Sequence, residues 1–208
     1  MRKASFIATI RGMTTITFGR MFQSEKNKGE GHDAYEKRCW RERMHSDSKG
    51  YVILQPGSIK LAMEVAAKLR SDSIPGKGKQ TFTKNIRGGM ISDPAVSPRI
   101  TVPSDDDMSE FVGVKAEDVI GRTINVPSDG RRGGTKRVPR IFPEIDAPWR
   151  VEVGFVVFDD NLIEHSEKLY EYLELAGWQV GIGVHRPETS GGDHGMFDVE
   201  DYVFEVQS

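Results

Sequence analysis

The chain has 208 residues, of which 37% are hydrophobic and 29% charged, and this is enough for one large domain with a buried core. No apolar run approaches the roughly 18 residues that a membrane span requires, and the single cysteine, Cys39, excludes an internal disulfide. The formal net charge of −2 is unevenly distributed: residues 1–140 carry +10 (26 Lys/Arg, 16 Asp/Glu) and residues 141–208 carry −12 (3 Lys/Arg, 15 Asp/Glu). This asymmetry predicts one surface that attracts a polyanion and another that repels it.

The first 70 residues predict a strand, a charged segment, a short strand and a helix. Residues 5–18 alternate apolar and polar side chains and are rich in Ile, Thr and Phe, as in a strand with a kink at Gly12. The charged stretch 34–50 is compatible with a short helix, and residues 51–54 (YVIL) predict a short strand. Strong helix formers fill residues 59–70, and Ser58 is predicted as the N-cap. The inward face of this helix is predicted to consist of Ile59, Ala62, Met63, Ala66 and Leu69.

Glycine and proline interrupt the middle of the chain. We expect loops or a hairpin over residues 71–110, with the acidic run Asp105–Asp107 as a solvated loop, and short strands between 112 and 126. Residues 138–145 predict an edge strand, because Pro139 and Pro143 lack the N–H that a ladder needs on both sides.

The C-terminal segment has the clearest periodicity. Residues 149–158 alternate and are β-branched, as in a strand, and residues 197–204 predict the last strand. Between them, residues 161–176 predict an amphipathic helix that Gly177 closes as a C-cap residue. Its inward side chains are predicted to be Leu162, Leu169, Leu173 and Ala176.

Motifs for common cofactors do not fit this chain. Gly181-Ile182-Gly183 lacks the preceding strand and following helix of a dinucleotide fingerprint, and no P-loop sequence occurs. The five histidines share no metal-ligand spacing. We therefore expect no cofactor and no bound metal. The glycines of residues 177–202 suit either a surface hairpin or a backbone that closely approaches a phosphate.

Two basic segments give the strongest signal that comes from the residues alone. Residues 77–87 and 131–140 together carry nine Lys/Arg and no acidic residue. Cations neutralise phosphates, and an aromatic ring among them offers a stacking platform worth about 1–3 kcal/mol per base. A contribution to solubility is the alternative role. The predicted nucleic-acid contacts are Lys77, Lys79, Phe82, Lys84, Arg87, Arg131, Arg132, Lys136, Arg137 and Arg140.

The order of these segments resembles the RAMP superfamily of RNA-binding proteins, and within it the subunits that form the helical backbone of CRISPR effector complexes. Residues 51–70, YVILQPGSIKLAMEVAAKLR, are similar to the family's strand and PGSSLKGALR helix start. Residues 176–199, AGWQVGIGVHRPETSGGDHGMFDV, are similar to its Gly-rich loop. The run 136–198 is also similar to phage-encoded proteins with the layout RxRP, strand, helix, AG, GxGxxRP and GGxxGxF. The resemblance covers about three fifths of the chain.

The chain departs from the family pattern at two places. Leu61-Ala62 stands where the family often has Gly-Ala, and Gly195-Met196-Phe197 replaces Gly-Arg-Phe. Because the expected arginine is absent, no RNA contact is carried over to position 196.

The resemblance implies an α+β fold: a ferredoxin-like (RRM-type) antiparallel sheet with helices on one face. Residues 1–208 would form a single RAMP-like domain with irregular loop insertions at about 19–50 and 71–135. The helix that follows Pro56 would meet phosphate at its N-terminus, where free N–H groups favour an anion, and the Gly-rich loop would line the opposite wall. The contacts implied by the resemblance are Arg20, Ser58, Lys60, Gly181, Gly183, His185 and Arg186.

We therefore expect a non-enzymatic, phage-derived protein that binds single-stranded RNA or DNA in the cytoplasm of a host, without membrane contact. Its oppositely charged halves favour homo-oligomers or a filament along the strand. One alternative is a RAMP-type endoribonuclease in which His32 or Asp33, in the loop after the first strand, activates a 2′-hydroxyl. The other is a protein-interaction or anti-defence module that does not bind nucleic acid.

Overall fold

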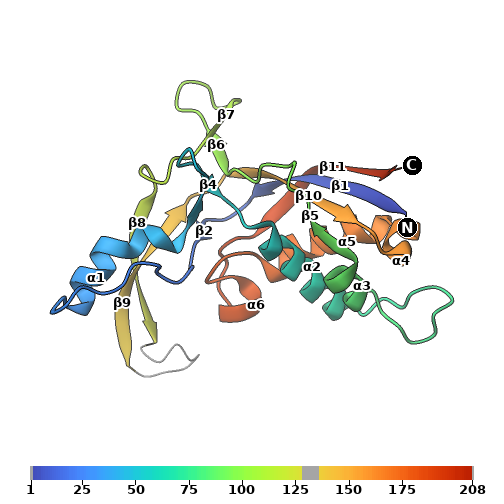
Figure 1. The fold of residues 1–208 in the computed structure, drawn as a ribbon, viewed down its shortest axis with the longest axis horizontal. Coiled ribbons are helices and arrows are strands. Elements are labelled where there is room, and N and C mark those ends of the chain that lie inside the picture. Colours follow the sequence, from blue (N-terminus) through green and yellow to red (C-terminus); the bar gives the residue numbers. More distant parts are fainter. Residues whose placement is uncertain (1, 128–135, 208) are drawn as a thin grey trace.

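Antiparallel sheet and helices are mixed along the chain, as the α+β prediction required. A computed structural model describes residues 2–127 and 136–207 (Figure 1). Its largest sheet has the strand order β11-β1-β10-β6-β7, and β5 pairs with β10 beside β6. The strands of this sheet are β1 (Lys3–Gly12), β5 (Met90–Ser92), β6 (Thr101–Pro103), β7 (Phe111–Gly113), β10 (Arg150–Val157) and β11 (Phe197–Gln207).

One face of the large sheet forms the core. Alternate residues of its two central strands are fully buried, from Ala4 to Ile10 on β1 and from Val151 to Val157 on β10. Three helices pack on this face, namely α2 (Pro56–Arg70), α3 (Thr83–Gly89) and α5 (Glu167–Leu175), and Figure 1 shows them together on one side of the sheet. The period-2 pattern that predicted the strands therefore places their apolar side chains against the helices.

The helix α2 begins earlier than predicted and buries a slightly different face. Its N-cap is Gln55 and Pro56 occupies the first turn, so the prediction of Ser58 as the N-cap is wrong. Proline is favoured there because an N–H in the first turn has no partner within the helix, so the absence of this group in proline costs no hydrogen bond. Leu69 is 58% exposed, contrary to prediction, while Ala67 is buried, so the packed face of the helix is rotated toward Ala67 in its last turns.

The predicted C-terminal helix is divided into α4 (Asp160–Glu164) and α5, and it continues as the π-helical turn η2 (Ala176–Val180). Gly177 therefore lies inside the helical segment, and the prediction that it acts as the C-cap is wrong. The chain leaves the helix at Gly181, whose φ of 69° lies in the region that glycine favours. The short helix α6 (Pro187–Ser190) follows in the Gly-rich loop.

A smaller lobe stands beside the large sheet. It contains a three-stranded sheet in the order β2-β9-β8, the helix α1 and a short hairpin (Figure 1). Its elements are β2 (Ile16–Thr17), α1 (His32–Cys39), η1 (Trp40–Arg43), β3 (His45–Ser46), β4 (Val52–Ile53), β8 (Ile120–Pro127) and β9 (Arg137–Ile145).

Two predictions about this lobe are corrected. The strand β9 is the middle strand of its sheet and not an edge strand, but β2 pairs only with its last two residues, Glu144 and Ile145. Pro139 therefore lies where β9 has a ladder on the β8 side alone, and Pro143, next to the β2 pairing, only accepts there, from the Phe18 N–H at 3.0 Å. His32 and Asp33 form the first turn of α1 and do not lie in a loop.

None of the helices that the structure describes has the length and apolar character needed to cross a membrane.

Candidate nucleic-acid interface

A cavity of about 380 Å³ opens between the start of α2, the segment after β2 and the Gly-rich loop; we call it the α2 cavity. Its volume lies within the range of about 300–1,000 Å³ that is usual for ligand sites. It brings together three of the predicted contacts, Arg20, Ser58 and Gly183. Arg43 and His45 line it as well, and no Asp or Glu is among the described residues of its wall.

The first turn of α2 contributes a positive helix terminus to this cavity. The turn has no side-chain cap and contains no acidic residue. Ser58 directs its hydroxyl to the Gln55 carbonyl at 2.6 Å, and its backbone N–H donates to the same oxygen at 2.9 Å. The partial positive charge of a 15-residue helix is therefore uncompensated by a local carboxylate.

An arginine and a histidine, Arg20 and His45, line this cavity together with the helix start. The Arg20 guanidinium forms no ion pair within the described part of the chain, although its backbone N–H donates to the Arg43 carbonyl at 2.9 Å. The Nδ1 atom of His45 lies 3.1 Å from the Nε2 atom of Gln55. Burial, and secondarily the charge of Arg20, lower the pKa of His45 below its ordinary value of 6.5. A bound anion would oppose both effects.

The Gly-rich loop reaches the cavity through Gly183, which lies against β2. Gly183 has a φ of 78°, and an added Cβ would overlap the carbonyl oxygen of Thr17. The next residue, Val184, donates its N–H to that same oxygen at 3.0 Å. Glycine is therefore required here for close packing of two backbones, in addition to any role toward a ligand.

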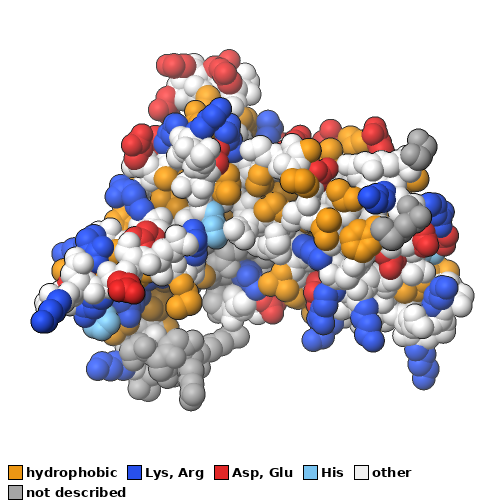
Figure 2. All heavy atoms as spheres, viewed as in Figure 1, with side chains coloured by type: hydrophobic (Ala, Val, Ile, Leu, Met, Phe, Trp, Pro, Cys, Tyr) orange, Lys and Arg blue, Asp and Glu red, His pale blue; other side chains and the backbone are white. Residues whose placement is uncertain are grey.

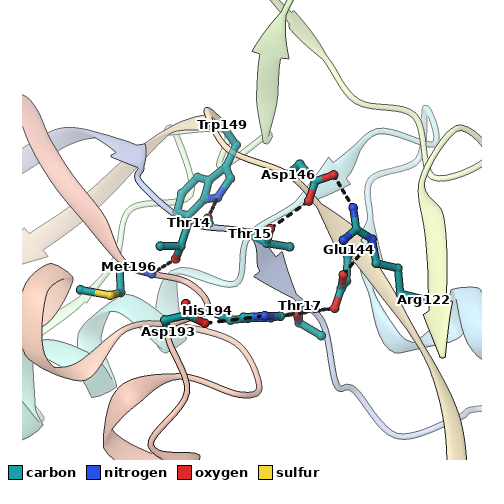
Figure 3. A network of polar contacts seen from close by, with 10 residues as sticks. All are labelled: Thr14, Thr15, Thr17, Arg122, Glu144, Asp146, Trp149, Asp193, His194 and Met196. Atoms are coloured by element: carbon teal, nitrogen blue, oxygen red, sulfur yellow. Dashed lines mark hydrogen bonds and ion pairs between the residues drawn. The ribbon is translucent and has the colours of Figure 1, made fainter. Parts of the chain in front are cut away.

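A polar network behind the cavity fixes this loop to β2 and β9 (Figure 3). The buried Thr17 hydroxyl lies 2.5 Å from Nδ1 of His194 and 3.1 Å from Oε1 of Glu144. Glu144 is in turn paired with Arg122 at 3.2 Å. Because these groups come from β2, β8, β9 and the Gly-rich loop, the network holds the wall of the cavity in place.

A second cavity of about 340 Å³ lies beside α1; we call it the α1 cavity. The described residues that line it are Met21, Phe22, His32, Tyr35, Arg43 and Arg140. Arg43 lines both cavities, so they are neighbours. The structure thus places Arg140 and His32, two residues named from the sequence, at this second cavity, whereas the exposed Asp33 is not among its lining residues.

Glu36 holds the two arginines of the α1 cavity. Its side chain is 5% exposed, and it pairs with Arg43 at 2.8 Å and with Arg140 at 3.1 Å. It also accepts the backbone N–H of Ile141 at 2.9 Å. A buried carboxylate with three donors fixes the planes of both guanidinium groups.

Several predicted contacts are not gathered at these cavities. Phe82 is 1% exposed and packs near Tyr172 and His165, so it cannot serve as a stacking platform as predicted. Lys60 donates to the Met90 carbonyl at 2.7 Å. Arg87 is paired with Glu64.

The remaining cations of residues 77–87, Lys77, Lys79 and Lys84, are exposed on the loop after α2 and on α3. Figure 1 shows this loop at the opposite end of the molecule from β9, so the described cations of the two basic segments do not form one patch. In Figure 2, Lys and Arg side chains accordingly gather both around α1 and below α2 and α3.

The rest of the Gly-rich loop lies behind the α2 cavity. Gly181, His185 and Arg186 are not among its described lining residues. His185, with a φ of 62°, packs edge-on against Phe142 and His194. Arg186 is occupied by the Gly183 carbonyl and by Glu188. Lys136 and Arg137 are exposed on or beside β9, and Arg131 and Arg132 lie outside the described residues.

Sequence reasoning missed Arg43, His45, Phe22 and Tyr35. For Tyr35 and Arg43, the available signal was the mixture of aromatic and basic residues in the stretch 35–43, YEKRCWRER. The described residues contain no group of three or more His, Cys, Asp or Glu that could hold a metal ion.

No family model and no curated protein matches this chain. Among solved structures, a chain from the cryo-EM structure of the Type III-B Cmr-beta bound to cognate target RNA matches with a TM-score of 0.49 and 12% identity, over 98% of this chain and 61% of that one. The crystal structure of Cmr6 from Pyrococcus furiosus matches with a TM-score of 0.47 and 10% identity, over 96% and 98%. This chain spans about three fifths of the length of the Cmr-beta chain. Both matched structures are named for Cmr proteins.

Proposed function

We propose that the protein binds single-stranded nucleic acid through the α2 cavity. The observation that carries this proposal is the convergence of Arg20, Arg43 and His45 on an uncapped helix N-terminus, in a wall without a described carboxylate. Such a wall attracts a phosphate by the helix dipole and by the charge of Arg20, whereas Arg43 is itself paired with Glu36. The neighbouring α1 cavity, reached past Arg43, extends the path for an adjacent nucleotide.

The open face of the large sheet is a less suitable surface. On β1 and β10 this face carries Ser5, Ile7, Thr9 and Glu152. The aromatic rings of these two strands, Phe6 and Phe155, are buried on the other face, so a base could not stack on them. We infer a ferredoxin-like arrangement, supported by the order β11-β1-β10-β5 with α2 and α5 on one face. In that arrangement, it is the loops beside the sheet that hold the strand.

Replacing Arg20 by glutamate tests the proposed site. We expect the dissociation constant for labelled 12-nucleotide RNA or DNA to rise at least about tenfold, because one phosphate contact is lost and a repulsive charge is added. The slope of log affinity against log salt should also fall by about 0.7 in magnitude. Fluorescence anisotropy at several salt concentrations measures both.

A matched control separates this site from general electrostatic attraction. The variant Lys77→Glu, Lys79→Glu changes two exposed cations at the other end of the molecule. If it weakens binding as much as Arg20→Glu does, the α2 cavity is not the principal site. Equal affinity of wild type and Arg20→Glu would contradict the proposal directly.

Binding is expected to depend on pH through His45. In the free protein, burial and Arg20 lower the pKa of this histidine. A phosphate favours the protonated imidazole and therefore raises its pKa, so binding takes up a proton and affinity rises as the pH falls from about 8 to about 5.5. With one proton involved, the gain cannot exceed about tenfold per pH unit. The variant His45→Asn should lose this slope, whereas His32→Asn, at the other cavity, should keep it.

One observation favours a second candidate function, endonucleolytic cleavage. His32 lines the α1 cavity together with two arginines, where a histidine could act on a 2′-hydroxyl. Product length on a denaturing gel decides between the two, since a binding protein leaves the RNA intact.

We further propose that copies assemble along a strand, supported by the +10 and −12 charges of the two segments of the chain.

A further inference from the structure

We propose that the α1 cavity is a base-binding subsite that receives one unstacked base of the strand and favours guanine and uracil, the bases with a keto group at C6 or C4 where adenine and cytosine carry an amino group. This inference rests on the proposed function, because it assigns a second contact to a strand held at the α2 cavity. It identifies which part of the ligand each cavity would recognise.

The wall of the α1 cavity combines aromatic rings with cationic groups. Phe22 and Tyr35 meet edge to face with ring centroids 5.1 Å apart, and both are only partly buried. The Arg43 guanidinium lies 4.3 Å from the centroid of Phe22 and 4.8 Å from that of Phe142, so the rings rather than this guanidinium offer the stacking surface. Flat aromatic rings are surfaces on which unstacked bases rest. A purely phosphate-binding site would not need the two rings.

The two arginines are already held in place before any ligand arrives. Glu36 pairs with both of them from below the cavity wall and is not itself among the described lining residues. The Nε of Arg43 is buried and has no hydrogen-bond partner in the described structure. A pre-organised group loses little entropy on binding, which raises the affinity that it can contribute.

The polarity of this wall selects among bases. Arginine side chains only donate hydrogen bonds, and the Tyr35 hydroxyl is already committed as a donor to the Ser24 carbonyl at 2.6 Å. Acceptor edges, such as O6 and N7 of guanine, match arginine donors. The amino groups that adenine and cytosine carry in place of O6 of guanine and O4 of uracil would find no carboxylate in the described wall and would lose their hydrogen bonds to water.

The geometry links the subsite to the phosphate site through one residue. Arg43 lines both cavities, and its backbone carbonyl accepts the N–H of Arg20. A phosphate in the α2 cavity and the base of a nearby nucleotide in the α1 cavity would therefore contact two sides of the same arginine. The charge of the phosphate and the stacking of the base would then be recognised together.

The test compares three labelled 12-nucleotide RNAs by fluorescence anisotropy: (GU)6, (AC)6 and a strand whose sugars carry no bases. We expect wild type to bind (GU)6 at least about tenfold more tightly than the abasic strand, with (AC)6 between them. The double variant Phe22→Ala, Tyr35→Ala should bind (GU)6 only as well as it binds the abasic strand, and its affinity for the abasic strand should equal that of wild type.

Each outcome discriminates. Unchanged binding of the abasic strand shows that the double variant is folded, and Trp178→Ala, which removes a half-exposed aromatic outside both cavities, should behave as wild type. If wild type binds all three strands equally and the double variant changes nothing, the base subsite is wrong while the phosphate site stands. If wild type binds none of them, the proposed function fails and the subsite fails with it.

Discussion

Replacing Arg43 by methionine is expected to lower the free energy of unfolding by about 3 kcal/mol, near the lower end of the range for breaking a buried ion pair. The reason lies in Glu36, whose carboxylate is 5% exposed and pairs with Arg43 at 2.8 Å. In this variant Glu36 would keep Arg140 and one backbone N–H as partners, which limits the loss of stability. For a chain of this length, the melting temperature should fall by about 6–12 °C.

The same substitution should weaken strand binding by at least about tenfold, since it removes the one cation that the two cavities share. Thermal melting and anisotropy measure the two effects separately.

A double variant separates the loss of the pair from the loss of the side chain. The double variant combines Arg43→Met with Glu36→Leu, so the buried carboxylate is removed together with its partner. The other partner of Glu36, Arg140, is 33% exposed and can be hydrated. We expect most of the stability to return, because the unpaired buried charge is the main cost. Binding should stay weak in the double variant. A single variant as stable as wild type would show that Glu36 does not depend on Arg43.

The strongly periodic segments were predictable from the sequence. The strand β10 and the helix α5 have their apolar residues at the predicted spacing; Leu169 and Leu173 of α5 are buried as predicted, and Tyr172, which was not predicted, is buried as well. Boundaries failed where packing overrode local signals. Gly177 looked like a helix end, but the chain adds a π-helical turn and turns only at Gly181, where the Gly-rich loop meets the rest of the fold.

The candidate site was only partly predictable, because much of it depends on contacts between distant segments. Arg20, Ser58 and Gly183 were named through the family resemblance, and the fold brings them to one cavity. Arg43 could not be ranked above other cations of its charged stretch, since its role depends on where the chain folds. Phe82 shows the opposite error: a ring among lysines looked exposed, and tertiary packing buries it.

The pair Gly183→Ala and Gly57→Ala tests how two of the three described glycines that line the α2 cavity act. Gly183 has a φ of 78° and no room for a Cβ against Thr17, so alanine there should cost at least about 2 kcal/mol and lower the melting temperature by about 4–8 °C. Gly57 has nothing within 4 Å of an added Cβ and lies in the first turn of α2, so alanine there should leave folding unchanged or slightly improved. Because Gly57 lines the cavity, the same methyl group should still weaken strand binding if a phosphate closely approaches the helix start. Melting curves and anisotropy on both variants give the comparison. Full stability of Gly183→Ala would show that the Gly-rich loop is not held against β2. Unaltered binding by Gly57→Ala would show that the phosphate does not lie at the start of α2.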